Sequence, residues 1–236
     1  MFKNNIYISY MNINTTKDFL DEYSIDDYFN LKKKYIPYLW TSAFGLSKLL
    51  VDDKPKEYVI TYIEVVHDIL GKDIDGKSLS EKIKLEWTKE SSPDIMAYFK
   101  DADPLLGSLR IGKKEQGLQP GIYLHYLTKW CHQLVKAAVK FNEDILFYQA
   151  CNILFTGIEK CKVGTKYARK MNTTLSSPLE NSEISHDPLD VHLVLASLKI
   201  NIDNLSHKNS SLYYIYKNLV IEFIKKNLDR VKGYTS

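Results

Sequence analysis

The sequence predicts an all-α protein with two helical lobes. Apolar residues recur at helical spacing in several long stretches, most clearly in residues 55–70 and 122–141. Prolines and capping residues precede such stretches, and Gly71 follows the first of them. The runs of strands that an α/β fold needs are missing. With 236 residues, 44% of them hydrophobic, the chain can bury a sizeable core.

The first third of the chain predicts an extended arm followed by helices. Residues 1–14 alternate weakly between apolar and polar side chains and have no neighbouring strand to pair with. We therefore expect an arm that docks on another subunit. Residues suited to helix starts follow in order at Thr15, Pro37, Pro55, Ser80 and Ser92.

The middle of the chain predicts a loop and two long helices. Residues 101–121 contain four of the ten glycines and read as a loop. The helix expected over residues 122–141 has one apolar face and one cationic face. A second helix is expected over residues 143–161. The predicted apolar face consists of Tyr123, Leu127, Trp130, Cys131, Leu134, Val135 and Ala138, with His125, Lys129, His132, Lys136 and Lys140 opposite.

The last third predicts a polar connection and a helical hairpin. Residues 173–188 are polar and long enough to separate two lobes. Asp187 and Pro188 suit the start of a helix, and a last helix is expected to end near Val231. The predicted domains are an arm at 1–14, a helical lobe at 15–172, a linker loop at 173–188 and a C-terminal helical hairpin at 189–236.

The net charge of +3 hides a basic central section. Residues 100–172 hold 12 Lys and Arg against 6 Asp and Glu, whereas residues 1–99 hold 13 against 16. Such asymmetry favours a polyanionic partner. Only three of the 32 basic residues are Arg, and Lys offers a point charge rather than a planar fork. This composition favours contacts with phosphates that do not depend on base sequence.

Three basic pieces are candidates for a nucleic-acid groove. They come from the glycine-rich loop, the cationic helix face and the run 160–170. Two tyrosines, Tyr126 and Tyr167, lie near enough in sequence to offer stacking surfaces. The alternative is an ordinary solvated surface of mixed charge. The candidate basic residues are Arg110, Lys113, Lys114, Lys129, Lys136, Lys140, Lys160, Lys162, Lys166, Arg169 and Lys170.

Motifs for nucleotide hydrolysis and for metal binding fail in detail. Residues 107–114 match a P-loop up to its lysine, but Lys114 replaces the hydroxyl residue that binds magnesium, and no strand precedes it. Lys129 lies between His125 and His132, where its ammonium would repel a cation. The cluster from His186 to His192 reads better as a helix cap than as a metal site. We therefore expect no metal and no cofactor.

Signatures of catalysis, secretion and membrane insertion are also missing. Asp26 and Asp27 lack the third carboxylate, three residues on, that the magnesium site of a prenyl-chain enzyme would need. Residues 73–76 do not match a calcium loop, because their glycine would be fourth rather than sixth. The three cysteines, Cys131, Cys151 and Cys161, have no CxxC spacing and read as small buried hydrophobes in a reducing compartment. No stretch resembles a signal peptide or a membrane span. A cytoplasmic protein is expected, and enzymatic activity is disfavoured.

These observations favour a sequence-nonspecific binder of single-stranded nucleic acid, and of RNA in particular. A nucleoprotein-like architecture would fit, with two helical lobes, a basic groove and arms that link homo-oligomers. One alternative is a helical protein-interaction module, such as a viral or bacterial effector, which would expose an apolar patch. Another is an unrecognised helical enzyme, which would show a closed pocket with converging carboxylates or histidines.

Overall fold

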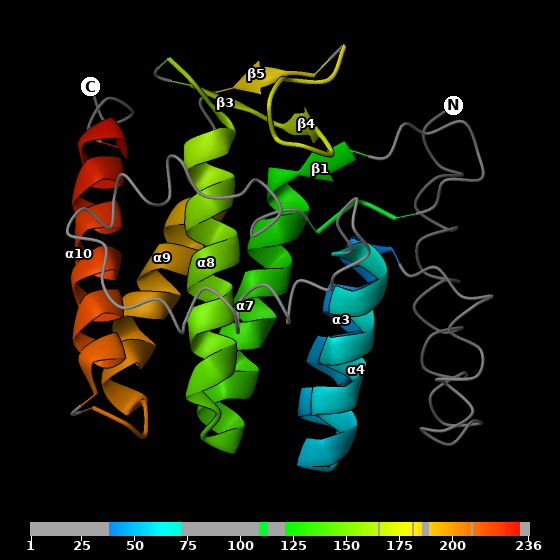
Figure 1. Ribbon diagram of the computed structural model, residues 1–236, viewed down its shortest axis with the longest axis vertical. Helices are drawn as coiled ribbons and strands as arrows, with labels where there is room; N and C mark the ends of the chain where they lie inside the picture. The colour runs from blue at the N-terminus through cyan, green and yellow to red at the C-terminus, as the bar shows by residue number, and fades with distance from the viewer. Residues whose placement is uncertain are drawn as a thin grey trace.

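The computed structural model describes residues 38–71, 109–112 and 121–231, apart from positions 165, 181, 186–188 and 209 (Figure 1). The predictions for the arm at 1–14, for the helices starting at Thr15, Ser80 and Ser92, and for Lys113 and Lys114 lie outside these residues. The described chain is mostly helical. Its helices are α3 (Leu39–Val51), α4 (Lys56–Leu70), α7 (Leu124–Phe141), α8 (Asp144–Lys160), α9 (Leu189–Asn201), the 3-10 helix η2 (Ile202–Asn204) and α10 (Ser211–Val231).

The helix predictions for residues 55–70, 122–141 and 143–161 are confirmed within two residues at each end. α4 starts after Pro55, which precedes its first turn, and stops at Gly71. α7 stops at Asn142, whose left-handed conformation (φ 54°, ψ 43°) ends a helix in the way that Asn tolerates. Local signals therefore place these helix ends correctly.

The expectation of a purely helical chain is wrong in one respect, because short strands occur among the described residues. β1 (Gly121–Tyr123) pairs antiparallel with β4 (Lys170–Asn172). β2 (Lys162–Val163) pairs with β3 (Lys166–Ala168), which pairs with β5 (Ile184–Ser185). Strands of two or three residues are too short to show the alternation by which a strand is read from sequence.

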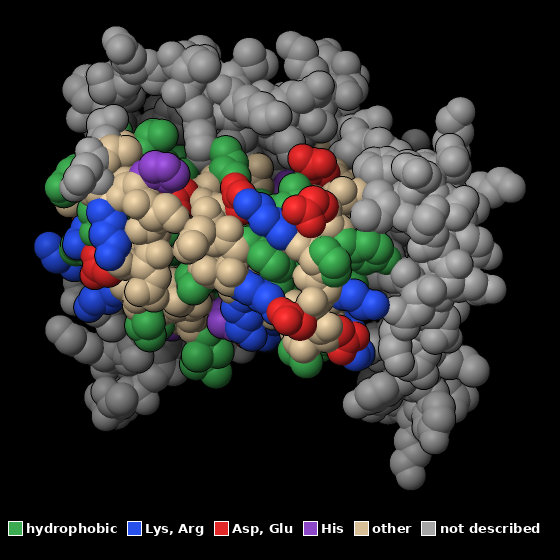
Figure 2. All heavy atoms as spheres, turned by 90° about the horizontal axis from the view of Figure 1, so that it is seen from below, with side chains coloured by type: hydrophobic (Ala, Val, Ile, Leu, Met, Phe, Trp, Pro, Cys, Tyr) green, Lys and Arg blue, Asp and Glu red, His purple; other side chains and the backbone are tan. Residues whose placement is uncertain are grey.

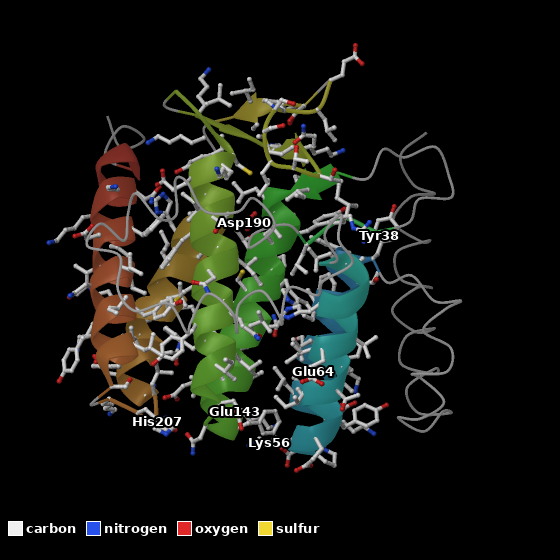
Figure 3. All side chains as sticks on the ribbon, in the orientation of Figure 1. Tyr38, Lys56, Glu64, Glu143, Asp190 and His207 are labelled. Carbon is white, nitrogen blue, oxygen red and sulfur yellow. The ribbon has the colours of Figure 1, made fainter. Side chains whose placement is uncertain are left out.

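The strands gather at one end of the helices (Figure 1). We call this the strand end and define it by β1 to β5 and the C-terminus of α8. The opposite end, called the loop end, holds the turn after α3, the start of α8 and the connection from η2 to α10. Figure 3 labels Lys56, Glu143 and His207 there.

α8 forms the centre of the helical layer. Nearly every residue from Asp144 to Ile158 is buried, as expected of a helix with apolar side chains on all sides. α7 packs between α8, α3 and α9, and α10 packs on α8 and α9. The Phe155 and Phe223 rings stack with centroids 4.0 Å apart. The buried hydrophobic residues form one connected cluster, and the division into two lobes stays a prediction.

The polar stretch after β4 folds back on the strands. Met171 bridges to Pro178, and β5 adds to β3. The Asn172 side chain organises the turn, because its amide nitrogen donates to the Ser176 hydroxyl at 2.8 Å and its carbonyl oxygen accepts from the Ser176 N–H at 2.9 Å. Residues 173–185, predicted as part of a linker, therefore complete the strand end where they are described.

Candidate nucleic-acid interface and adjoining cleft

The basic run 160–170 builds the surface of the strand end. α8 ends at Lys160, and the chain enters the hairpin of β2 and β3 at once. Gly164 turns this hairpin with a positive φ of 61°, a conformation that glycine adopts without strain. Lys162 and Lys166 are exposed on its two strands. Strand pairing therefore holds these ammonium groups at one end of the molecule.

Most cations of this run have no acidic partner. Within the described part of the chain, Lys160, Lys162 and Lys166 form no ion pair. The Lys170 ammonium lies 5.6 Å from the centroid of the Tyr123 ring, a cation–π distance. Arg169 is the exception, because its Nη1 lies 2.8 Å from Glu183 Oε2. The result is an excess of positive charge that a polyanion would relieve.

Arg110 lies next to the strand end but serves the fold. Its backbone N–H and its Nε both donate to the Leu70 carbonyl, at 3.0 Å and 3.3 Å. The guanidinium is half-buried, and this burial lowers the pKa of Arg110. Ile111 then donates to the Gly121 carbonyl at 2.9 Å, which joins this segment to β1. Arg110 thus closes the C-terminus of α4 instead of extending the exposed cationic surface.

The predicted cationic face of α7 is real but does not continue the strand end. Lys129 Nζ lies 2.9 Å from Asp190 Oδ1, and Lys140 pairs with Asp53 and donates to the Leu50 carbonyl at 2.7 Å. At about 1.5 Å per residue, Lys140 lies about 16 Å further along the helix than Lys129, toward the loop end. Of the three lysines of this α7 face, Lys136 is the one that is exposed and forms no ion pair with the described residues. Two of the three lysines thus have acidic partners, and contact of this face with phosphates stays a prediction.

Tyr167 is not available for stacking, which corrects the prediction for this residue. Its side chain is only 3% exposed, and its hydroxyl donates to Asn227 Oδ1 at 2.6 Å. Through this hydrogen bond Tyr167 instead links β3 to α10. The other predicted stacking residue, Tyr126, is half-buried in an aromatic cluster with Tyr123 and Trp40, with centroids 4.6 Å and 5.3 Å away. Burial first, then the nearby Tyr123 and Tyr38, raise the pKa of Tyr126.

Sequence reasoning missed two lysines of α10 that lie beside the strand end. Lys225 and Lys226 are exposed on α10 next to Asn227, which is bonded to Tyr167 of β3. The signal in the sequence was a basic cluster near the end of the last helix, which also suits the negative end of the helix dipole. The bond to Tyr167 shows that this helix end lies beside the basic run.

A cleft opens between the start of α7, the strands and the start of α9. Its volume is about 290 Å³. Its wall combines apolar side chains from Leu124 and Val191 with polar and charged groups. Figure 3 labels Asp190, which contributes from α9. The lining residues are Tyr123, Leu124, His125, Thr128, Tyr167, Arg169, Asp190 and Val191.

Asp190 in this cleft holds two cationic or donor groups of α7. Its Oδ2 accepts a hydrogen bond from His125 Nδ1, because a carboxylate can only accept, and its Oδ1 faces Lys129. Burial alone would raise the pKa of Asp190, but the hydrogen bonds and charges of Lys129 and His125 outweigh this and hold it below its usual value. Asp190 is therefore a carboxylate that orients the His125 ring.

Trp40 covers the other side of His125. The two rings stack at 5.2 Å with an interplanar angle of 26°, and the Trp40 ring is half-buried. The Nδ1 of His125 is used by Asp190, and its Nε2 has no hydrogen-bond partner among the described residues. The imidazole is thus fixed from two sides while one nitrogen stays available.

Burial and neighbouring charges shift the pKa of several other reactive groups of the described chain. Within residues 38–71, 109–112 and 121–231, no three His, Cys, Asp or Glu side chains gather as metal ligands would. Burial lowers the pKa of His132, and the charges of Lys136 and Lys129 lower it further. The three cysteines are buried as predicted, and burial raises the pKa of Cys161 to about 12, which keeps this thiol protonated.

No helix in the described part of the chain has the length and apolar character needed to cross a membrane. Comparison of the chain with protein-family models, with curated proteins and with solved structures finds no match.

Proposed function

We propose that the protein binds single-stranded nucleic acid, with RNA as the expected polymer, through the strand end and without sequence specificity. The observation that carries this proposal is the run of Lys160, Lys162 and Lys166, exposed or half-buried and without acidic partners in the described residues. Lysine contributes charge rather than bidentate base readout, so affinity should depend on salt and little on sequence.

The strand end offers more than isolated charges. The positive surface extends over three elements. Lys170 lies over the Tyr123 ring, and Lys225 and Lys226 lie on α10 next to the Tyr167–Asn227 hydrogen bond. Tyr123 is half-buried and adds an aromatic ring next to a cation, a combination that single-strand binders use. The proposed architecture remains nucleoprotein-like, with two lobes and homo-oligomers linked by terminal arms. The buried thiols suit the reducing environment of a cytoplasmic site.

A charge-matched pair of triple variants tests the proposal. Lys160→Gln, Lys162→Gln and Lys166→Gln together should weaken binding of a fluorescent oligouridylate. They should also reduce the slope of log affinity against log salt by roughly two units, at about 0.7 per phosphate contact. The control triple Lys48→Gln, Lys56→Gln and Lys217→Gln removes the same charge at the loop end and should leave the slope unchanged. Equal effects of both triples, or no binding by the wild type at low salt, would overturn the proposal.

A comparison of oligouridylate with oligothymidylate and with duplex DNA defines the polymer. Binding to the two single strands should exceed binding to the duplex, because a duplex cannot offer its bases to the aromatic ring of Tyr123. Tighter binding to the duplex would contradict the single-strand assignment.

A protein-interaction module is the second candidate, because α9 exposes an apolar stripe. Leu189, Leu193 and Ile200 are 63%, 56% and 72% exposed, and their spacing of four and seven residues places them on one helix face. In this alternative the stripe is the contact surface, and we expect a second copy of the chain to occupy it. Leu193→Glu with Ile200→Glu should lower the mass measured by light scattering. Tyr214→Glu on α10, where the native side chain is 56% exposed, is the control.

A further inference from the structure

We infer that the cleft at the start of α7 binds a nucleoside monophosphate unit, with Arg169 and His125 at the phosphate. This inference goes beyond strand binding by the exposed lysines, because the cleft involves none of Lys160, Lys162 and Lys166. It holds whether or not those lysines bind a polymer.

The size and wall of the cleft set the class of ligand. A volume of about 290 Å³ is at the lower limit of small-molecule sites, which is roughly 300 Å³. Leu124 and Val191 form an apolar wall, and the Tyr123 ring lies at the same cleft. A planar aromatic group fits such a wall by stacking and by apolar contact. A ligand that consists of an anion alone would leave this part of the cleft unused.

The charges favour an anionic group on that ligand. Arg169 lines the cleft, and the Lys170 ammonium lies beside Tyr123. Asp190 is the acidic residue of the lining, and both of its oxygens are engaged, one by His125 and one by Lys129. Its charge is therefore compensated before a ligand arrives. The first turn of α7 contains no acidic residue, so the helix dipole adds to the positive side.

His125 is placed to contact the anion. The Nδ1–H of His125 donates to Asp190, and Trp40 stacks on the ring, so that the ring cannot turn away without losing both contacts. Its Nε2 has no partner among the described residues. When both ring nitrogens carry a proton, Nδ1–H donates to Asp190 and Nε2–H can donate to a phosphate oxygen. Charge-assisted hydrogen bonds of this kind are the strong ones.

Arg169 forms an ion pair that a phosphate could replace, and substitution of either partner tests this. Its pair with Glu183 is exposed, with side chains 42% and 72% accessible, and exposed ion pairs contribute little free energy. A phosphate at Arg169 would compete with Glu183. Removal of the Arg169 charge should therefore weaken the ligand, whereas removal of the Glu183 charge should strengthen it.

The experiment uses the full chain without any polymer present. Adenosine 5′-monophosphate is titrated by calorimetry and by tryptophan fluorescence, to which Trp40 beside His125 contributes as one of three tryptophans. Arg169→Gln should weaken binding at least ~10-fold, as expected for a lost charge-assisted hydrogen bond. Glu183→Gln should tighten binding severalfold. Lys199→Gln, an exposed charge change on α9 away from the cleft, should leave affinity unchanged.

Adenosine and inorganic phosphate are titrated separately to test the two halves of the ligand. Both should bind more weakly than the monophosphate. Binding of phosphate alone with the same affinity would overturn the role given to the apolar wall. The inference would be overturned if the monophosphate shows no binding up to roughly 10 mM and no strand shows binding that Arg169→Gln weakens.

An oligouridylate distinguishes the two sources of the nucleotide. If only the oligomer changes the tryptophan fluorescence, and Arg169→Gln abolishes the change, the ligand is one residue of a strand. If the monophosphate binds and the Lys160, Lys162 and Lys166 triple variant still binds it, the site serves the free nucleotide and stands even where strand binding fails. Should Arg169→Gln not fold, Glu183→Gln alone decides, because unchanged affinity in this variant would contradict the competition.

Discussion

At the loop end of the molecule lysines lie against carboxylates, whereas at the strand end most of them do not. Figure 2, viewed from below, shows blue and red side chains next to one another at the loop end. Both ends use the same residue type, so the number of lysines does not distinguish them. The difference lies in which carboxylates the fold brings near. The loop-end pairs are Lys48–Asp52, Lys56–Glu143, Lys140–Asp53 and Lys217–Asp203.

This comparison separates lysines that form ion pairs within the chain from lysines that can bind a partner through their unpaired charge. The loop end also contains Asp144, a carboxylate 7% exposed that accepts from the Ser206 and His207 N–H groups at 2.9 Å and 2.8 Å. No comparable carboxylate faces Lys162 or Lys166 among the described residues. Loss of the buried Asp144 carboxylate should therefore lower stability, whereas loss of the strand-end lysines should lower affinity for a polyanion.

The largest expected effect concerns His67, in the last turn of α4 beside the strand half of the core. Its Nε2 accepts from Trp130 Nε1 at 2.9 Å, and complete burial lowers the pKa of His67 to about 3. The His67 ring takes up a proton near pH 6.5 in the unfolded chain but not in the folded chain. The contribution of neutral His67 to the free energy of unfolding is therefore fully present above that pH and is lost as the pH falls below it. Between pH 7 and 4.5 the free energy of unfolding should fall by about 2.5 kcal/mol, because the effect begins only near pH 6.5 and amounts to about 1.4 kcal/mol per pH unit below it.

Urea denaturation at several pH values measures this loss. In His67→Gln, which cannot take up the proton, the free energy of unfolding should depend much less on pH over the same interval. An equally steep dependence in the variant would show that His67 is not its source.

Next in size is the carboxylate at the loop end. Asp144→Ala removes an acceptor from two backbone N–H groups and should lower the free energy of unfolding by about 2 kcal/mol. Burial alone would raise the pKa of Asp144, but the N–H groups and His207 outweigh it and lower the pKa. The stability from Asp144 is therefore present above the unfolded pKa of about 3.9 and is lost as the pH falls through the lower folded value.

A matched substitution isolates the effect of burial. Asp203→Ala removes a carboxylate that is 62% exposed and pairs with Lys217, so its effect on thermal unfolding should be clearly smaller. Equal losses in the two variants would remove the distinction between a buried anchor and an exposed pair.

The smallest expected effect is on the stability of the strand-end variant. The Lys160, Lys162 and Lys166 substitutions should each change the free energy of unfolding by no more than about 0.5 kcal/mol, because these lysines have no ion pairs to lose in the described structure. Calorimetric unfolding measures this directly. A large destabilisation would mean that these lysines serve the fold, and the contrast between the two ends would fail.

Sequence reasoning could predict the helices because their signals are local. The apolar spacing of α7 and the Pro55 and Gly71 boundaries of α4 lie within single segments. The strands escaped prediction because they are two or three residues long and exist through pairing with residues far away in sequence, as Tyr123 pairs with Lys170.

The candidate site was predictable in part for the same reason. The run 160–170 is contiguous, so its charge excess is visible in the sequence. The neutralisation of Lys129 by Asp190 and of Lys140 by Asp53 depends on tertiary contacts. The hydrogen bonds of Tyr167 with Asn227 and of His125 with Asp190 likewise join residues 60 and 65 positions apart.

The burial of α8 on nearly all sides has a consequence for exchange with solvent. Amide hydrogens of a helix enclosed by other helices exchange only when a large part of the structure opens. Deuterium uptake should therefore be slowest in residues 146–158 and much faster in the hairpin of β2 and β3, whose residues Lys162 and Val163 are exposed. Of the described elements, α8 would then exchange its amide hydrogens most slowly, although it leads directly into the cationic hairpin. The hairpin could change conformation around a ligand while α8 stays folded.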